Sequence, residues 1–370
     1  MPPLSLLIKP ASGICNLRCT YCFYHDIANK RVQVSYGFMT LNTMEQVIIR
    51  AFEFADGYCS FAFQGGEPTL VGLDFYAKFV ELVNIHNDKK LTIHYALQTN
   101  GYCLSPEWGD FFYHNHFLIG ISLDGTIHTH NAYRKHSSGN ETFAEIMETI
   151  HMLEDKKVDF NILTVVNSKT AASIRKIYSF YKKNNFNYLQ FIPCLEPFEE
   201  RSGQKDYSLT PETYGQFLCD LFDLWHIDIM QGKLVSIRLF DNYISMLKGL
   251  PPESCDMQGI CSRQHVVEAD GSVYPCDFYV FDRYRIGNVW EDSITEMDIK
   301  RSEIKFIEES IIAKPECKAC PYYFLCRGGC KRHRMMTGDT SYQNNYFCSS
   351  YKKFFAYAED RLIQTARMFR

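Results

Sequence analysis

The chain lacks a strong excess of charge of either sign. Its 370 residues hold 39 Lys and Arg against 43 Asp and Glu, a formal net charge of −4. There is also no low-complexity tract and no long run of like charges. Such a balance offers no electrostatic surface for nucleic acid or for an anionic membrane, so neither is expected as a partner.

Long hydrophobic runs are lacking as well. No uninterrupted apolar segment reaches the length of a membrane span, and the N-terminal MPPLSLLIKP does not have the pattern of a secretory signal. We therefore expect a cytoplasmic protein whose thiols stay reduced. The odd number of cysteines, 15, argues further against a fully disulfide-bonded secreted scaffold.

What the chain does have is a regular alternation of β-rich and helical patterns. Strands are predicted at 4–8, 58–64, 92–99, 117–124, 160–166 and 188–193. Helices are predicted at 42–54, 73–86, 106–114, 141–156 and 171–183, with Ser105 and Thr170 as N-caps of the third and the last. Apolar strands alternating with helices indicate a parallel sheet. Six units are too few for a closed barrel, so we predict an α/β fold with an open partial (β/α)6 TIM-like barrel and its chemistry at the C-terminal strand ends.

The rest of the chain has a different character. A helix is predicted at 211–231, followed by short segments with dense cysteines and a last helix at 349–369. The short segments have little regular apolar pattern, so metal ligation is expected to stabilise them. The length exceeds what one core usually holds, and we predict domains at 1–230 and 231–370.

Eleven of the cysteines form two groups with iron–sulfur spacing. The first group is Cys15-x3-Cys19-x2-Cys22, directly after the first predicted strand. Three thiolates can hold a four-iron cluster and leave one iron open to another ligand. The alternative is a zinc site completed by His25, although zinc ligands usually come as two cysteine pairs.

Together with Tyr21, this group resembles the Cys-x3-Cys-x-aromatic-Cys signature of the radical S-adenosylmethionine (SAM) superfamily. The resemblance implies that the open iron binds the amino and carboxyl groups of SAM. It also implies that an electron from the cluster cleaves the sulfonium to give a 5′-deoxyadenosyl radical. The cofactor then carries the hard chemistry, and the protein positions it.

Other motifs at strand ends fit the same resemblance. Gly65-Gly66-Glu67-Pro68 resembles the turn that binds the methionine amino group. The resemblance assigns further SAM contacts to Ser122 and Asp124 near the ribose and carboxylate, Arg134 at the carboxylate, and Tyr21 and Leu195 at the adenine. From the residues alone, alternatives remain: a purely structural turn, a surface charge at Arg134, and core packing for the two adenine contacts.

The second group holds eight thiolates, enough to close two more clusters. Its spacing resembles the SPASM extension of peptide-modifying radical SAM enzymes. The resemblance implies one auxiliary cluster on Cys255, Cys261, Cys276 and Cys330 and another on Cys317, Cys320, Cys326 and Cys348. The protein would then carry three [4Fe–4S] clusters. Electron transfer is the expected role of the auxiliary pair, and clusters that only stabilise the domain are the alternative.

The four remaining cysteines lack ligand spacing. Most of them are expected to be small buried hydrophobic side chains. They are Cys59, Cys103, Cys194 and Cys219.

Most of the chain, including Tyr274-Pro275-Cys276-Asp277-Phe278, resembles the anaerobic sulfatase-maturating enzymes. The resemblance implies a radical SAM oxidase that converts a cysteine or serine of a sulfatase to Cα-formylglycine, within a Cys/Ser-x-Pro/Ala-x-Arg motif. Asp277 would be the general base, because a proton and an electron must still leave after Cβ hydrogen abstraction. On the residues alone, a solvated or hydrogen-bonded turn aspartate is the better interpretation of Asp277, and the family resemblance reverses it. A monomer served by flavodoxin or ferredoxin is expected.

Substrate contacts and rival functions are less constrained by the sequence. Tyr24 and Gln64 flank the cofactor motifs and are candidate peptide contacts, with core or solvent roles as alternatives. The nearest rival is another SPASM enzyme that forms thioether or carbon–carbon crosslinks. Such enzymes often have an N-terminal leader-binding domain, whereas the first strand here begins at once. A non-enzymatic zinc scaffold is the rival of another class, and it would be colourless and free of iron.

Overall fold

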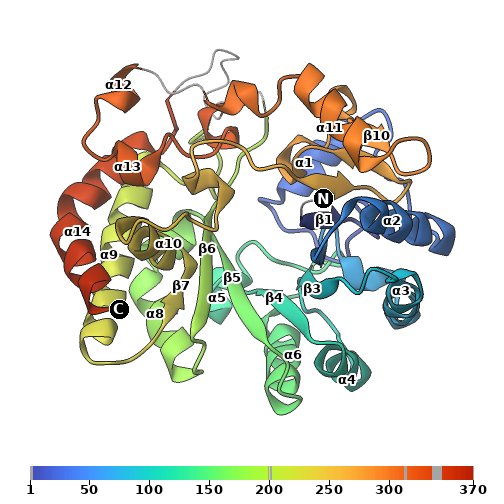
Figure 1. The fold of residues 1–370 in the computed structure, drawn as a ribbon. Coiled ribbons are helices and arrows are strands. Elements are labelled where there is room, and N and C mark those ends of the chain that lie inside the picture. The colour runs from blue at the N-terminus through green and yellow to red at the C-terminus, as the bar shows by residue number, and fades with distance from the viewer. Residues whose placement is uncertain (1–2, 199, 201, 312–314, 336–343, 370) are drawn as a thin grey trace. The chain divides into compact units, whose positions relative to one another are not determined.

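The computed structural model describes residues 3–198, 200, 202–311, 315–335 and 344–369 (Figure 1). The chain forms two compact units, and each draws on segments far apart in the sequence. Unit 1 comprises Met1–Ser122, Arg134–Phe160 and Arg263–Phe306. Unit 2 comprises Leu123–Tyr133, Asn161–Ser262 and Ile307–Arg370. The predicted domain boundary at residue 230 stays a prediction.

Unit 1 is built on a mostly parallel sheet. Strands β1 (Leu4–Ile8), β2 (Tyr58–Phe63), β3 (Thr92–Thr99) and β4 (Phe117–Ser122) pair in sequence order, all parallel. On the other edge of β1, β8 (His265–Val267) pairs in parallel, and β9 (Ser272–Tyr274) and β10 (Gly287–Asn288) continue antiparallel. A late, cysteine-rich part of the chain therefore extends the N-terminal sheet.

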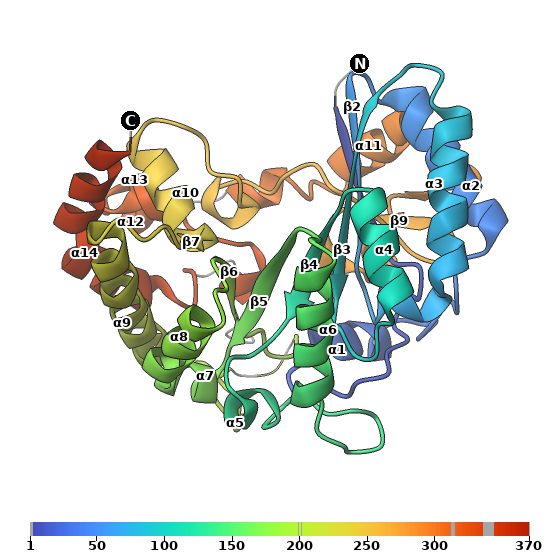
Figure 2. The same ribbon diagram turned by 90° about the horizontal axis from the view of Figure 1, so that it is seen from below.

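Helices cover one face of this sheet, as the two views show (Figures 1 and 2). They are α2 (Leu41–Phe54), α3 (Leu73–His86), α4 (Pro106–His114) and α6 (Phe143–Asp155), while α1 (Phe23–Asn29) and α11 (Ile294–Glu303) complete the unit. The core between sheet and helices is aromatic: Phe61 and Phe63 each meet the Phe79 ring edge-on at 5.0 Å. Burying each such ring contributes about 1.5–3 kcal/mol, which makes the sheet a rigid support for the loops at its ends.

Unit 2 carries fewer strands, all of them parallel, and more helix. Its strands are β5 (Phe160–Val166), β6 (Tyr188–Pro193) and β7 (Ser236–Ile237), paired in that order. Its longer helices are α8 (Ile174–Lys183), α9 (Pro211–Met230), α10 (Arg238–Leu247) and α14 (Cys348–Met368). Its short helices are α5 (Ile127–His130), α7 (Ser168–Ala172), α12 (Pro315–Lys318) and α13 (Tyr323–Cys326).

Helices α14 and α9 lie side by side in unit 2 (Figures 1 and 2). Gly215 permits this approach, because a Cβ there would already meet the Ser350 Cα at 3.1 Å. The Ser350 hydroxyl donates to the Pro211 carbonyl at 2.6 Å. The C-terminal helix is therefore fixed along α9, as the expected final helix at 349–369 required.

The expected strands and helices are confirmed within two residues at most ends, with one clear error. Thr170 is not an N-cap, since α7 already begins at Ser168. The Asn167 side chain accepts the N–H groups of Lys169 and Thr170, and the Thr170 hydroxyl accepts the Asn167 N–H. This reciprocal capping box starts the helix three residues earlier, and a break at Ser173 divides it from α8. Ser105 does occupy the N-cap position of α4.

No helix among the described residues is long and apolar enough to cross a membrane.

Candidate active site

The first cysteine group lies on the loop between β1 and α1 in unit 1. Cys22 is the N-cap of α1, and its backbone N–H donates to the Cys19 carbonyl at 3.1 Å. The loop is held from outside by the Arg18 N–H, which donates to the Lys135 carbonyl at 2.8 Å. One short loop therefore carries all three thiols, and it is held by the Arg18 backbone bond and by the start of α1. Such an arrangement suits ligation of a single cluster.

Cys15 has hydrogen-bond donors around its sulfur. The Leu17 N–H lies 3.3 Å from Sγ and the Asn100 Nδ2 lies 3.7 Å from it. Burial, with a smaller contribution from the charge of Glu67, raises the pKa of the Cys15 thiol to about 12 despite these donors. A thiol in this place needs a metal to become a thiolate, and the donors suit a sulfur that carries negative charge.

The Gly65-Gly66 pair lets the next loop press against the cysteine loop. A Cβ on Gly66 would lie 2.1 Å from the Ile14 carbonyl oxygen, and Gly65 has φ +128°. The Gly66 and Glu67 N–H groups donate to the Ser12 and Ile14 carbonyls at 2.9 and 2.7 Å. Only glycine permits this approach, so the turn fixes the start of the cluster loop.

The Glu67 carboxylate is buried, 1% exposed, and accepts four hydrogen bonds. Oε1 accepts from the Thr69 N–H, the Thr69 hydroxyl and the Thr99 hydroxyl, and Oε2 accepts from the Asn100 N–H. Burial raises the pKa of Glu67, and these donors oppose the rise. The side chain ties its own turn to the loop after β3, which the sequence reading did not anticipate.

Arg134 is 6% exposed and is not a surface charge. Its guanidinium lies 3.9 Å from the Cys19 sulfur and 5.5 Å from the centre of the buried Tyr21 ring. Ser122, at the end of β4, accepts a hydrogen bond from Gln98 on β3 at 3.2 Å. The Ser122 hydroxyl therefore lies at the C-terminal end of a strand of this sheet. The Arg134 guanidinium lies near the cysteine loop.

Asp124 and Leu195 belong to unit 2. Asp124 is fully buried, and its Oδ1 accepts the Val165 N–H at 3.0 Å. Its carbonyl accepts from the Thr129 hydroxyl at 2.6 Å. Leu195 is buried just after β6, where the preceding Cys194 N–H donates to the Val166 carbonyl. Both residues stand at strand ends, as expected, and Asp124 has a structural contact there.

Asp277 lies in unit 1 at the start of a 3₁₀ turn, η3 (Asp277–Tyr279), and is 8% exposed. Its Oδ2 accepts the Tyr24 hydroxyl at 2.5 Å, although the two residues are 253 positions apart. Gln64 also hydrogen-bonds the Tyr24 hydroxyl. Burial raises the pKa of Asp277, while the Lys9 charge and the Tyr24 bond lower it. The expected base and both expected peptide contacts are thus connected through one phenol.

Next to the Tyr24 ring lies a buried ion network that the sequence did not predict. Glu268 Oε1 is 2.8 Å from Lys9 Nζ and 2.7 Å from Arg31 NH1, and all three side chains are almost fully buried. Lys9 Nζ also stands 5.1 Å from the centre of the Tyr24 ring. The only signal in the sequence was Lys9, directly after an apolar strand. By itself, a lysine in this position indicates no more than the end of the strand.

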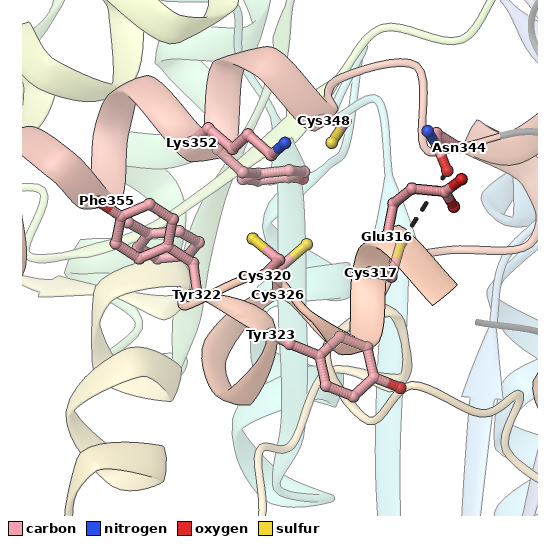
Figure 3. A pocket seen from close by; sticks show the side chains of 12 residues that line it. Glu316, Cys317, Cys320, Tyr322, Tyr323, Cys326, Asn344, Cys348, Lys352 and Phe355 are labelled. Atoms are coloured by element: carbon pink, nitrogen blue, oxygen red, sulfur yellow. Dashed lines mark hydrogen bonds between the residues drawn. The ribbon is translucent and has the colours of Figure 1, made fainter. Parts of the chain in front are cut away.

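Four late cysteines line one pocket in unit 2. Figure 3 shows their sulfur atoms facing a common space, with Tyr322, Lys352 and Phe355 around it. The four are Cys317, Cys320, Cys326 and Cys348. Burial, with smaller contributions from the three neighbouring thiols, raises the pKa of Cys326 to about 11. Four thiols around an otherwise largely apolar space fit a fully ligated iron–sulfur cluster.

Three further cysteines form a separate group in unit 2. Burial raises the pKa of Cys330 to about 12, and the charges of Cys255 and Cys261 raise it further. Its sulfur accepts the Arg332 N–H at 3.3 Å. Burial raises the pKa of Cys261, and the charges of Lys331 and Arg334 oppose the rise. Cys276, the expected fourth member, belongs to unit 1. Of the four cysteines without ligand spacing, Cys59, Cys194 and Cys219 are buried and Cys103 is exposed.

Comparisons with known proteins agree with this geometry. The model of the radical SAM superfamily matches residues 10–181, and that of the SPASM iron–sulfur cluster-binding domain matches residues 255–321. A cysteine-type anaerobic sulfatase-maturating enzyme from Clostridium novyi is 48% identical over 367 residues, 99% of this chain and 98% of that protein. The chain belongs to the anaerobic sulfatase-maturating enzyme family. Its cofactors are therefore SAM and [4Fe–4S] clusters, including the auxiliary clusters of a SPASM domain.

Two more members of the family place the chain within it. A serine-type anaerobic sulfatase-maturating enzyme from Bacteroides thetaiotaomicron is 32% identical over 95% of this chain and 89% of its own. A solved structure, native anSMEcpe with bound AdoMet and Cp18Cys peptide, matches with a TM-score of 0.96 and 46% identity over 100% of both chains. The expected α/β fold class, with its partial barrel and SPASM extension, is confirmed by this match.

Proposed function

We propose that this radical SAM enzyme oxidises a cysteine of a sulfatase polypeptide to Cα-formylglycine. One observation carries the proposal: the Tyr24–Asp277 hydrogen bond joins a carboxylate next to Cys276 to the helix that begins at Cys22. A proton acceptor is thereby held at the loop of the radical-generating cluster.

The ligand sets follow the grouping of the thiols. Cys15, Cys19 and Cys22 would hold the open cluster. The four cysteines around the pocket would hold one auxiliary cluster: Cys317, Cys320, Cys326 and Cys348. Cys255, Cys261 and Cys330, joined by Cys276, would hold the other, which gives three [4Fe–4S] clusters in all.

SAM would be held by residues at the C-terminal strand ends. The Gly65–Gly66–Glu67 turn would accept the methionine ammonium, and Arg134 would pair with the carboxylate. Ser122 and Asp124 would contact SAM near its ribose and carboxylate. Tyr21 and Leu195 would flank the adenine. Arg134 is buried and its guanidinium lies 3.9 Å from the Cys19 sulfur, which supports this role because it places a cation beside the loop of the open cluster.

The open cluster held by Cys15, Cys19 and Cys22 would supply, together with SAM, the radical chemistry that takes one hydrogen atom from the substrate Cβ. The substrate must then lose one proton and one electron to form a carbon–sulfur double bond, which water converts to the aldehyde with release of hydrogen sulfide. Asp277 takes the thiol proton, and Tyr24 orients the carboxylate that receives it. The auxiliary clusters would supply an acceptor for the electron. Gln64, which also hydrogen-bonds Tyr24, contacts the peptide from the same side.

Cysteine is proposed over serine because the cysteine-type relative is 48% identical and the serine-type one only 32%. The target would be a Cys-x-Pro-x-Arg or Cys-x-Ala-x-Arg segment. We further propose that the protein is cytoplasmic, since ligand thiols must stay reduced until clusters assemble. We also propose that it is a monomer and that flavodoxin or ferredoxin supplies its electrons.

The test is anaerobic incubation of the reduced enzyme with SAM and two peptides that differ only in Cys-x-Pro-x-Arg against Ser-x-Pro-x-Arg. The cysteine peptide should lose its thiol and gain a carbonyl by mass spectrometry, faster than the serine peptide loses two hydrogens. SAM cleavage with an unchanged peptide mass would refute the proposal. A crosslinked peptide without a carbonyl would point to the thioether or carbon–carbon alternative.

A further inference from the structure

Asn100 stands where the loop after β3 meets the cysteine loop. It is 8% exposed, and its backbone N–H, its Oδ1 and its Nδ2 each have a partner. Its backbone N–H donates to Glu67 Oε2 at 2.7 Å, and its Oδ1 accepts the Tyr102 N–H at 2.8 Å. Its Nδ2 lies 2.8 Å from Asn16 Oδ1 and 3.7 Å from Cys15 Sγ.

These contacts decide which way the amide faces. The Tyr102 backbone N–H can only donate, so the Asn100 atom opposite it must be the oxygen. A flipped amide would set its NH₂ against that N–H and lose the bond to Asn16. The donor side therefore points at the Cys15 sulfur, and the backbone bond to Glu67 holds the residue in place.

A donor aimed at a ligand sulfur changes the energetics of a cluster. Reduction adds negative charge that is spread over the sulfurs, so an N–H···S bond stabilises the reduced state more than the oxidised one. The effect is larger at a buried site, where water does not screen it. The Leu17 N–H also donates to this sulfur, but a backbone group is the same in almost every sequence, whereas Asn100 supplies a side-chain donor.

We propose that Asn100 is a positioning residue that raises the reduction potential of the open cluster by donating to Cys15, in an orientation held by Glu67 and Tyr102. The proposal rests on the assignment of the open cluster to Cys15, Cys19 and Cys22. It makes the Glu67 of the glycine turn an indirect support of the cluster, in addition to any contact with SAM.

The test is a redox titration of the reconstituted holoenzyme followed by electron paramagnetic resonance. The open cluster is identified as the signal that SAM perturbs. Asn100→Asp keeps the acceptor for Tyr102 but replaces the donor facing Cys15 by an anionic oxygen. At a fixed potential, the reduced-to-oxidised ratio of this cluster should fall about tenfold, a negative shift of about 59 mV for one electron. Asn100→Ala, which removes the donor without adding charge, should shift it in the same direction by less.

Asn167→Asp is the matched control, because Asn167 is another buried asparagine and its side-chain oxygen accepts the N–H groups of Lys169 and Thr170. It should leave the potential unchanged. An unchanged potential in both Asn100 variants, at full iron content, would overturn the inference. Loss of the SAM-responsive cluster from both variants would also overturn it, since Asn100 would then act in assembly. A wild-type enzyme without any SAM-responsive signal would instead refute the proposed function.

Discussion

Asp277 shows at the scale of a single residue how burial and a neighbour define a role. Replacing it with Asn keeps its volume but removes the carboxylate that would take the substrate proton. We predict that Asp277→Asn retains its iron and still cleaves SAM, while formylglycine falls by about 10²–10⁴-fold, the usual contribution of a general base. Iron analysis, release of 5′-deoxyadenosine and peptide mass together measure this. A normal product yield would remove Asp277 from the mechanism.

Tyr24 should have a smaller effect, because it orients the base and does not itself accept the proton. Tyr24→Phe removes one hydrogen bond to a carboxylate, worth about 1.5–3 kcal/mol. Product formation is expected to fall about ten- to a hundredfold, with SAM cleavage continuing uncoupled from it. The ratio of 5′-deoxyadenosine to formylglycine is the measurement. A ratio equal to that of the wild type would show that the phenol has no part in orienting Asp277.

At the scale of elements, we predict opposite results for alanine substitutions at two glycines near the cluster loop. In Gly66→Ala the new Cβ would lie 2.1 Å from the Ile14 carbonyl oxygen, so the cysteine loop must shift. We expect that variant to lose SAM cleavage and part of its iron. Gly13→Ala is the control, since its Cβ would meet its nearest neighbour, the Ala28 Cβ, at an ordinary 3.6 Å. Equal activity of the two variants would contradict the close approach of the two loops.

The same scale shows the limits of local patterns. The strands could be predicted because their apolar runs follow from burial on both faces of a parallel sheet. The start of α7 could not, because Asn167 and Thr170 compete for the cap and their reciprocal bonds decide between them. The segment Thr99-Asn100-Gly101 at the end of β3 was visible in the sequence, but nothing local indicated that Asn100 faces Cys15.

At the scale of the molecule, the Lys9–Glu268–Arg31 network joins three distant segments of unit 1. Burial alone would raise the pKa of Glu268, but the two cations outweigh it and lower the pKa to about 2. Glu268→Gln leaves both cations buried without their anion, and we expect the free energy of unfolding to fall by about 3–5 kcal/mol. Anaerobic urea unfolding at neutral pH measures this. A change below about 1 kcal/mol would show that the network adds little.

The difference in unfolding free energy between wild type and Glu268→Gln depends on pH, because the pKa of Glu268 is lowered in the folded state. A carboxylate with a lowered folded-state pKa stabilises the fold above its ordinary pKa of 4.5 and loses that contribution as the pH falls toward about 2. The gap in unfolding free energy between wild type and Glu268→Gln should therefore be constant from pH 7 to about 5.5 and narrow below about pH 4.5. A gap that widens on acidification would contradict the assignment.

The sequence by itself determined the chemistry available to this protein. Ligand spacing, the glycine turn and the alternation of strands are local properties, because thiols three or four positions apart and residues on one strand are held together by the chain itself. Only the tertiary structure decided which distant groups meet. Asp277 with Tyr24, Asn100 with Cys15, and Glu268 with Lys9 and Arg31 are brought together by parallel strand order and by a late segment that joins the first sheet. No local periodicity encodes such contacts, since their partners are set by the packing of the whole sheet.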